Sequence, residues 1–490
     1  MIRRLATLAA FGALAACSLE PTYVRPAPPV PAGWPVGDAY LRQSEAALPT
    51  VTYRDIFRDP RLQRVIERAL ANNQDIAVAL ANVASARALY RVERSALLPA
   101  VDAAGRVSIS DSGTGSTTTG TTGTGTGTIV SSGGGTRTVY TANVGVTAFE
   151  LDLFGRIRNL NKAALQEYLA TEAAVRAARL TIVGDVASAW LTLATDRSLL
   201  AIAIDTEASA KRSVDLTDAR RAGGIAPRSD VRQAQTVLEQ ARSDRANLVT
   251  LVAQDRNALE LLVGTPVADA DLPASIESVD GTLATLPAGL DSRILLRRPD
   301  VVQAEYVLRA ANARIGAARA AFFPTISLTA AVGFASTALS SLFTGGAFTW
   351  SAAPAVGLPI FDGGANRGNL AYAEAQADRA VALYRQTIQI AFREVADALA
   401  RQGTVATQAA ANIALEEAAR DNYVLADARY REGIDTFLTS LDAQRTLYNA
   451  RRSLASTRLV RATNLVELYR TLGGDELIDP AVTAAPAPTR

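Results

Sequence analysis

The chain has 490 residues, of which 50 are lysine or arginine and 48 are aspartate or glutamate, so its formal net charge is only +2. This balance excludes the strongly basic tract that a nucleic-acid-binding protein presents. Histidine is absent, and the chain has one cysteine and one methionine, which excludes histidine-based acid–base chemistry, Cys/His zinc sites and an intrachain disulfide.

Residues 1–16 have the parts of a bacterial signal peptide: Arg3 and Arg4, a short apolar run, and small residues before Cys17. The apolar run is too short to span a bilayer. A small-residue site that ends in cysteine is typical of a lipobox, so we expect Cys17 to become a lipidated first residue with an N-acyl chain and an S-diacylglycerol. Ser18 follows, which favours the outer membrane over the inner one. An ordinary signal peptide with an incidental cysteine is the alternative.

Residues 17–57 are rich in proline between Pro21 and Pro35 and are predicted to form an extended strap. No later segment has about 18 uninterrupted apolar residues, so we expect no transmembrane helix in the mature chain. If the mature chain crosses a membrane, it must do so as strands. The last residues, 474–490, are predicted to form a flexible tail.

The sequence contains an internal repeat. Residues 96–101 recur as 321–326, and Gly224-Ile225 recurs 209 positions later as Gly433-Ile434, with further matches downstream at the same spacing. The chain is therefore a tandem duplication. It divides into repeat 1 at 58–264, a connecting segment at 265–289, and repeat 2 at 290–473.

Each repeat is predicted to hold a helix, two strands and a pair of long helices. An insertion in repeat 1, residues 111–138, is almost entirely Gly, Ser and Thr and is predicted to be a flexible solvent loop. Its Gly-Thr repeats lack the lysine and the following helix of a phosphate loop. The predicted strands are 101–110, 139–151, 325–334 and 348–360, and the predicted long helices are 157–222, 227–264, 365–432 and 436–472.

The strand candidates alternate between apolar and small or polar residues. From Thr325 to Phe334 every even position is apolar, and repeat 1 shows a weaker version that ends at Ala148. Each segment has about ten residues, the length of a tilted transmembrane strand. A soluble four-stranded sheet with one buried face would fit the same alternation. Four strands cannot close a barrel, so membrane strands would require several chains to share one.

The long helices have the composition of a coiled coil. The segment 157–222 is rich in alanine, lacks proline, and would be about 100 Å long as one helix. In 227–264 the apolar residues follow a 3–4 spacing from Val231 to Leu262, interrupted by Arg245 and Asp255. Both a tunnel wall and a plain antiparallel coiled coil without a pore fit this periodicity.

Turn residues separate the two helices of each pair. Gly223, Gly224 and Pro227 lie between the helices of repeat 1, and Gly433 and Asp435, followed by Thr436, lie between those of repeat 2. Glycine provides a left-handed cap, while proline or an Asp/Thr cap starts the next helix. Each helix pair is therefore predicted to fold back at a tight tip.

The chain contains six longer motifs, in this order: 21–26, 151–156, 297–300, 310–316, 356–364 and 430–445. Together they resemble the TolC-like outer-membrane factors, in particular the lipoprotein branch that serves tripartite efflux pumps. The resemblance implies an α+β membrane protein, in which a homotrimer forms a twelve-stranded β-barrel continued by a periplasmic α-helical barrel. It also implies two partners, a periplasmic adaptor protein and an inner-membrane transporter of the RND type, besides outer-membrane lipids.

The resemblance maps the family's periplasmic constriction onto Leu438 and Asp442. Three Asp442 carboxylates around one axis would attract cations, and three Leu438 side chains would form an apolar plug. The plain alternative is that Leu438 is a seam residue, packed in the contact between paired helices, and that Asp442 is a solvated carboxylate at a helix start, where the helix dipole favours it. Repeat 1 has Ser229 and Gln233 at the matching positions, so only one tip would contribute these rings.

One departure limits what can be transferred from the family. TolC itself has an arginine where this tip has Asp435, so its gate-locking ion pair is not carried over. Gly223, Gly224, Pro227, Gly433 and Asp435 are expected to shape the tips and to contact the adaptor.

The sequence favours a passive efflux channel in the outer membrane with a gated tunnel for small toxic solutes. A lipoprotein that scaffolds the envelope without forming a pore is a second hypothesis, and it requires the alternating segments to be soluble. An enzyme is a third, but no nucleophile–base pair stands out. We expect no metal site and no cofactor other than the lipid.

Overall fold

The computed structural model describes residues 19–40, 52–112, 119–122, 125–128, 135–279, 281–283 and 292–474. The signal peptide, Cys17 and nearly all of the C-terminal tail lie outside these residues. The chain divides into two compact units. The described residues within 1–27, 82–172 and 303–384 belong to the first unit, and those within 28–81, 173–302 and 385–490 belong to the second.

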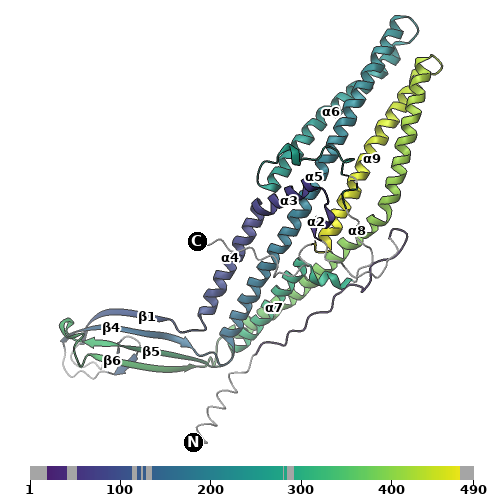
Figure 1. Ribbon diagram of the computed structural model, residues 1–490. Helices are drawn as coiled ribbons and strands as arrows, with labels where there is room; N and C mark the ends of the chain where they lie inside the picture. The colour runs from purple at the N-terminus through teal and green to yellow at the C-terminus, as the bar shows by residue number, and fades with distance from the viewer. Residues whose placement is uncertain are drawn as a thin grey trace. The chain divides into compact units, whose positions relative to one another are not determined.

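The first unit contains a four-stranded antiparallel sheet with the strand order β1-β4-β5-β6 (Figure 1). The central pair, β4 and β5, joins the second strand of repeat 1 to the first strand of repeat 2. β1 and β6 are therefore the two edges of the sheet. The strands are β1 (Val101–Ser112), β4 (Gly135–Glu150), β5 (Thr325–Ser336) and β6 (Phe348–Gly357).

The strand ends differ from the predicted ones for reasons of pairing. β4 starts at Gly135 rather than at 139 because β1 extends to Ser112 and pairs with it throughout. β6 ends at Gly357 rather than at 360 because its partner β5 begins only at Thr325, directly after a proline.

The prediction of an unstructured insertion at 111–138 is wrong in part. Besides the ends of β1 and β4, the insertion contains two short antiparallel strands, β2 (Thr119–Thr122) and β3 (Gly125–Thr128). In their register Thr119 is opposite Thr128, and Gly120 is opposite Gly127. Threonine is β-branched and favours an extended backbone, so a Gly-Thr repeat can pair even though it cannot build a core.

Each of the four long helices begins and ends within one residue of its predicted bounds. Helix ends fray, so a difference of one residue is not significant. The long helices form two hairpins, α5–α6 and α8–α9 (Figure 1). The α-helices are α2 (Tyr53–Ile56), α3 (Pro60–Asn72), α4 (Gln74–Ser95), α5 (Arg156–Ala222), α6 (Arg228–Val263), α7 (Pro299–Ala320), α8 (Ala365–Arg431) and α9 (Phe437–Thr471), and the 3-10 helices are η1 (Asp269–Asp271), η2 (Ser292–Arg297) and η3 (Leu339–Ser341).

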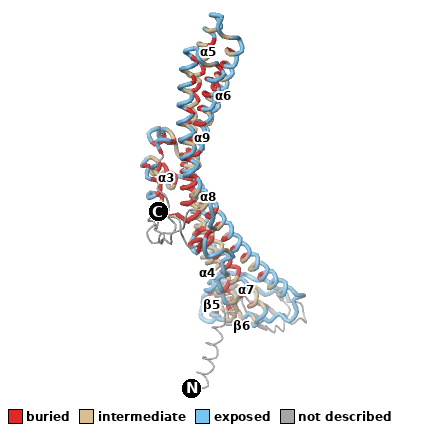
Figure 2. The backbone as a smooth tube through the Cα atoms, turned by 90° about the vertical axis from the view of Figure 1, so that its right-hand side faces the viewer, coloured by how far each residue is buried: buried red, intermediate tan, exposed pale blue. Residues whose placement is uncertain are grey.

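The main core lies in the second unit, where buried residues follow α5, α6 and α9 (Figure 2). Trp190 and Tyr469 are its largest side chains, both almost fully buried. The indole nitrogen of Trp190 donates a hydrogen bond to the carbonyl of Asp271 at 3.0 Å, so the polar end of this ring is satisfied inside the core.

The seam that the sequence predicts on α6 is present, with Val231 and Leu259 among its buried residues. The two interruptions have different partners on α5. Arg245 forms an ion pair with Glu207 at 2.9 Å. Asp255 is half-buried, and burial together with the neighbouring Asp196 carboxylate raises its pKa to about 6.

The motif 297–300 has a structural role. Arg298 is buried, donates to the carbonyl of Thr471 at 3.0 Å, and forms ion pairs with Asp300 at 2.7 Å and Glu394 at 2.9 Å. These contacts tie the start of α7 to the last residue of α9, at the two ends of repeat 2.

By length and composition, one described helix, α5, is long and apolar enough to cross a membrane. No such helix was predicted from the sequence. The window that meets this test has a mean hydropathy of 1.2 and is 56% buried, which is typical of a core helix packed against other helices.

Candidate gate and membrane-facing sheet

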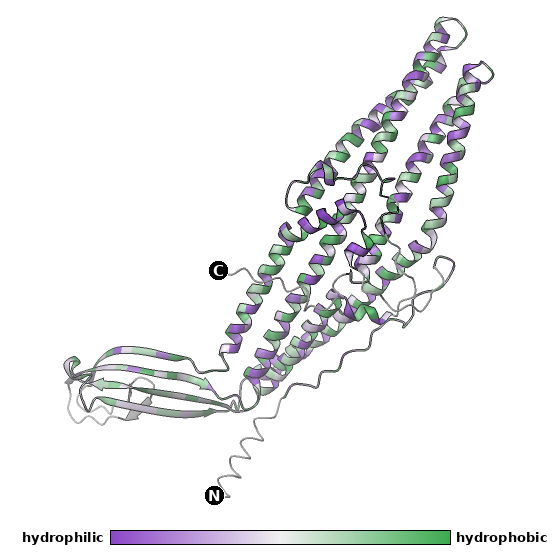
Figure 3. Ribbon diagram, in the orientation of Figure 1, coloured by the Kyte–Doolittle hydropathy of each residue, from purple (hydrophilic) through white to green (hydrophobic). Residues whose placement is uncertain are grey.

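All four strands place their apolar residues on one face of the sheet. The register aligns Val144 with Val332 and Val332 with Trp350, and on the other side of β4 it aligns Ala103 with Val144. Hydrophobic residues therefore recur in all four strands (Figure 3). In β1 and β6 this face is largely solvent-exposed within one chain, as Val107 and Trp350 show. In β4 and β5 it is mostly half-buried, although Val332 is exposed.

The opposite face carries polar and small residues. In the same register Asn143 is opposite Gly333, and Gly333 is opposite Thr349, while Arg106 pairs with Thr141. A soluble sheet would bury its apolar face against a second layer. The described part of the chain provides no such layer over these strands, and a bare apolar face of this extent is typical of a protein–protein or membrane surface.

The prediction that Ala148 continues the apolar face of β4 is wrong. The register shifts between Val146 and Phe149, so Phe149 rather than Ala148 is opposite Leu328. Ala148 has a left-handed backbone with φ 51°, and its N–H donates to Oγ1 of Thr329 at 3.1 Å. This bulge inserts one extra residue and keeps a large apolar side chain on the apolar face.

Two glycines allow β4 and β5 to approach closely on the polar face. A Cβ on Gly333 would lie 2.2 Å from the carbonyl oxygen of Ala142, and one on Gly145 would lie 2.5 Å from that of Ala330. Both obstructing atoms belong to the backbone, so relief would require the strands to move. Glycine at such places marks a sharp bend of a sheet.

We predict that Gly333→Val will destabilise the sheet by about 2 kcal/mol or more, because overpacking against backbone forces the two strands apart. Gly345→Val is the control, since no atom lies within 4 Å of a Cβ at that position. Unfolding of the purified protein in urea, followed by tryptophan fluorescence, compares the two variants. Equal stabilities would show that the close approach of the strands is unimportant.

Both helix hairpins close with the same backbone motif. Gly224 and Gly433 each have φ 76°, in the left-handed region. The residue after each glycine, Ile225 or Ile434, donates its N–H to a carbonyl in the last turn of the preceding helix. This is the Schellman arrangement that glycine favours. The two repeats, whose tips are 209 positions apart, therefore share the same backbone hydrogen bonds at this turn.

The structure shows the local role of each remaining tip residue. Gly223 does not have a left-handed backbone and instead precedes the glycine that does. Pro227 and Thr436 occupy the N-cap positions of α6 and α9, but neither makes a side-chain capping bond. Asp435 forms an ion pair with Arg429 at 2.6 Å within the same tip, and the hydrogen bond from this arginine holds the pKa of Asp435 below its usual range.

Leu438 and Asp442 lie one helical turn apart near the start of α9, and both are exposed; Leu438 is 60% exposed. Their neighbours Phe437 and Leu441 occupy the hairpin core, where the ring of Tyr430 packs against Phe437. Leu438 is thus not a seam residue. Asp442 is solvated within one chain, as in the plain alternative, but it lies beyond the first turn of α9, where the helix dipole has little influence.

The two tips of the second unit are joined by Arg220. Its guanidinium donates to the carbonyl of Tyr430 at 2.9 Å and lies 4.5 Å from the centre of that tyrosine ring. Its repeat equivalent, Arg429, binds Asp435 instead. Ser229 and Gln233 are exposed at the same positions on α6 that Leu438 and Asp442 occupy on α9.

The N-terminal strap is held by a cluster that was not predicted from the sequence. We call it the strap clasp: Tyr23, Arg25, Glu305 and Arg309. The carboxylate of Glu305 accepts from Arg25 at 2.6 Å, from Arg309 at 2.6 Å and from Tyr23 at 3.2 Å. The Arg309 guanidinium lies over the Tyr23 ring. The only signal in the sequence was the pairing of Tyr23 with Arg25 in the motif 21–26, but Glu305, the partner of Arg25 on α7, is 280 residues away.

The strap is held a second time by Glu20, which pairs with Lys162 of α5 at 2.7 Å. Asn312 of α7 donates to the carbonyl of Pro21 at 2.8 Å. A Cβ on Gly316 would lie 2.8 Å from Cα of Glu20, so this glycine makes room for the strap. The motif 310–316 is therefore a seat for the chain's N-terminal segment.

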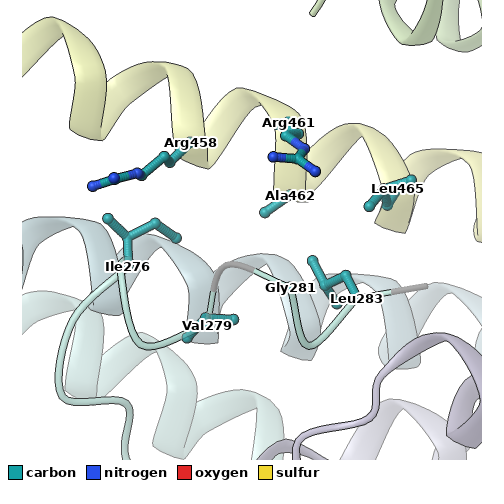
Figure 4. Close-up of a pocket in the computed structure, with 8 residues that line it drawn as sticks. All are labelled: Ile276, Val279, Gly281, Leu283, Arg458, Arg461, Ala462 and Leu465. Atoms are coloured by element: carbon teal, nitrogen blue, oxygen red, sulfur yellow. The ribbon is translucent and has the colours of Figure 1, made fainter. Parts of the chain in front are cut away.

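A small pocket between α9 and residues 276–283 is too small for a solute (Figure 4). Its volume is about 20 Å³, enough for roughly one water molecule. Among the described residues, no group of three or more Asp, Glu, Cys or His side chains is placed to hold a metal ion. The features with functional geometry are the apolar sheet face and the tip residues.

A sheet with an exposed apolar face and long helical hairpins is the arrangement expected of a membrane channel subunit. Residues 65–265 and 290–474 match the outer membrane efflux protein family. The chain is 43% identical to the solvent efflux pump outer membrane protein SrpC of Pseudomonas putida, over 94% of this chain and 96% of that one. It is 41% identical to the outer membrane protein OprJ of Pseudomonas aeruginosa, over 94% and 93%.

Two solved structures have the same fold. A membrane protein from Pseudomonas aeruginosa matches with a TM-score of 0.84 and 38% identity, over 93% of this chain and all of that one. The open state of the MtrE outer membrane channel of Neisseria gonorrhoeae matches with a TM-score of 0.81 and 33% identity, over 94% and 98%. The chain belongs to the outer membrane efflux protein family. It is a transport protein of the outer membrane and not an enzyme.

Proposed function

We propose that three copies of this chain form one closed channel, with a twelve-stranded barrel in the outer membrane and a tunnel of α-helices in the periplasm. The observation that carries this proposal is the sheet: it has one apolar face and two unpaired edges, β1 and β6. An open edge is not tolerated in hydrocarbon, because its backbone N–H and C=O groups would have no partners. Copies of the same chain can supply those partners edge to edge.

Leu438 and Asp442 form the periplasmic gate in this proposal. Their exposure within one chain leaves them free to meet the same residues of two other copies at the channel axis. Leucine rings exclude water from a narrow passage, and a ring of carboxylates attracts cations. The Arg220 contact with Tyr430 and the Arg429 pair with Asp435 hold the tips in shape.

The tips also present an apolar surface for a periplasmic adaptor. Ile225 and Ile434 are exposed at equivalent positions of the two hairpins, one on each tip. An adaptor that binds them would connect the channel to an inner-membrane transporter, which supplies the energy. Relatives of this chain are named for the efflux of solvents, toluene and antibiotics. We therefore propose small toxic organic solutes as the cargo.

Cys17 carries the lipid in this proposal, with an N-acyl chain and an S-diacylglycerol that anchor the N-terminus. Glu20, held on α5 and α7, is only three residues further along the chain. We predict that Cys17→Ser will abolish incorporation of labelled palmitate, while the protein still folds. Palmitate labelling followed by gel electrophoresis checks this, and label retained in the variant would rule Cys17 out as the lipid site.

Conductance tests the channel directly. The purified full-length protein, added to a planar lipid bilayer, is expected to give discrete conductance steps. Heat-denatured protein is the control. A folded protein that binds the bilayer without conductance, even after Leu438 and Asp442 are both changed to alanine, would favour an envelope scaffold without a pore.

A further inference from the structure

The two repeats contain the same junction between a strand and a long helix. In repeat 1 the residues 151–154 after β4 read Leu-Asp-Leu-Phe, and in repeat 2 the residues 358–361 after β6 read Leu-Pro-Ile-Phe. Each stretch ends in a phenylalanine just before the long helix. Phe361 of repeat 2 is therefore the counterpart of Phe154 of repeat 1.

Phe154 is half-buried and has an aromatic partner within the chain. Its ring stacks on Phe323 with centroids 4.8 Å apart and an interplanar angle of 23°. Phe323 lies in the turn between α7 and β5. The contact therefore joins the end of β4 in repeat 1 to the start of β5 in repeat 2, the two strands that pair at the centre of the sheet.

The counterparts of both rings are much more exposed than the rings themselves, and Phe323 itself is 38% exposed. Phe361 is 91% exposed. Phe323 corresponds to Leu98, 225 positions earlier in the turn between α4 and β1, and Leu98 is 72% exposed. Phe361 follows edge strand β6, and Leu98 precedes edge strand β1. At the centre of the sheet both partners of the contact, Phe154 and Phe323, are present in one chain. At each edge of the sheet only one of the two corresponding residues is present.

We propose that Phe361 packs on Leu98 of a second copy of this chain, in the way that Phe154 packs on Phe323 within one chain. The occupant is a second copy because the surface that fits Phe361 is encoded by this chain and is left open on it. This inference rests on the proposed oligomer and specifies its contact.

Pairing between copies in the register of the central strands would place Phe361 within two residues of Leu98. Within the chain Ala142 of β4 is opposite Phe334 of β5. The two strand pairs β1–β4 and β5–β6 can be superposed by their registers. In that superposition Ala352 of β6 corresponds to Ala142 of β4, and Ile109 of β1 corresponds to Phe334 of β5. Ala352 and Ile109 lie on the apolar faces of their strands. Pairing between copies in this register would therefore continue one apolar surface from chain to chain.

Cross-linking of mixed copies tests the contact. One sample of the full-length protein carries Leu98→Cys and the other carries Phe361→Cys; they are mixed unfolded, refolded together in detergent, and treated with a short bis-maleimide. We expect roughly tenfold more cross-linked dimer than when Leu98→Cys is mixed with Phe343→Cys, because cross-linking requires the two thiols to be adjacent. Phe343 is a matched control, since it is 72% exposed in the connection between β5 and β6. Wild-type chain measures any background from Cys17.

A second variant separates assembly from folding. Phe361→Ala is expected to raise the dissociation constant of the oligomer roughly tenfold or more without changing the circular dichroism of the single chain, since it removes a central aromatic contact. Native mass spectrometry measures the oligomer. An intact oligomer with equal cross-linking at Phe361 and Phe343 would overturn this contact while leaving the proposed channel in place. A chain that stays monomeric in detergent would overturn both.

Discussion

Replacing Leu438 and Asp442 together by alanine will raise the single-channel conductance severalfold. In the proposed trimer this double change removes three apolar side chains and three carboxylates from the narrowest part of the channel. Both side chains are exposed, and the hairpin core next to them is formed by Phe437 and Leu441, so the substitutions leave the packing of the tip intact. Planar-bilayer recordings of the purified variants measure the effect.

The other tip provides a matched control. Ser229→Ala with Gln233→Ala changes exposed residues at the same helix positions and is expected to leave conductance unaltered. Asp442→Asn alone keeps the size of the side chain and removes its charge, so it should weaken the preference for cations while conductance changes little. If the double alanine variant conducts like the wild type, Leu438 and Asp442 do not form the gate.

Glu305→Ala will open the strap clasp. The Glu305 side chain is only 7% exposed, and its removal leaves Arg25 and Arg309 without their shared acceptor. Losing one partner of such a buried pair costs about 3 kcal/mol, and we expect the lower end of the known range because Arg25 is half-exposed. Chymotrypsin should then cut after Tyr23, which the clasp covers in the wild-type chain; the rate of this cleavage is the measurement.

The control for the clasp is Glu374→Ala. Glu374 forms an exposed ion pair with Arg319 at 3.7 Å in the same unit, and its loss should change neither cleavage nor stability measurably. Equal cleavage of the two variants would contradict a role for Glu305 in holding the strap.

The clasp also has a defined pH dependence. Burial by itself raises the pKa of Glu305, but hydrogen bonds from Arg25 and Arg309 outweigh it and hold the pKa below its usual range. A carboxyl group with a lowered pKa in the folded state stabilises that state above its unfolded pKa. This stabilisation is lost as the pH falls through the lowered value. The strap should therefore stay protected at neutral pH and become accessible only in acid.

The parts of the fold that depend on local pattern were predicted from the sequence. Period-two alternation in 325–334 indicated a strand with one apolar face, and glycines at 224 and 433 indicated the turns, because both effects act over a few residues. The internal repeat added the order of the elements. The candidate gate at Leu438 and Asp442 came from family resemblance, and the structure adds that both are exposed.

The rest depends on contacts between distant residues. The bulge at Ala148 exists because β4 must pair with β5, and nothing within β4 announces it. Glu305 lies in a helix rich in alanine and arginine, where a glutamate is normally a solvated charge, so its burial under the strap was not predicted. Phe154 and Phe361 look equivalent in sequence, and only the structure distinguishes the half-buried ring from the exposed one.

The most direct test of the central claim, that the apolar sheet face lies in lipid, is a scan of β6 with nitroxide spin labels in membranes. Each residue from Thr349 to Val356 is replaced in turn by a labelled cysteine, and accessibility to oxygen and to a water-soluble nickel complex is measured by electron paramagnetic resonance. We predict high oxygen accessibility at the even positions and high nickel accessibility at the odd ones, with period two. Nickel accessibility at every position, without alternation, would contradict a membrane-spanning sheet.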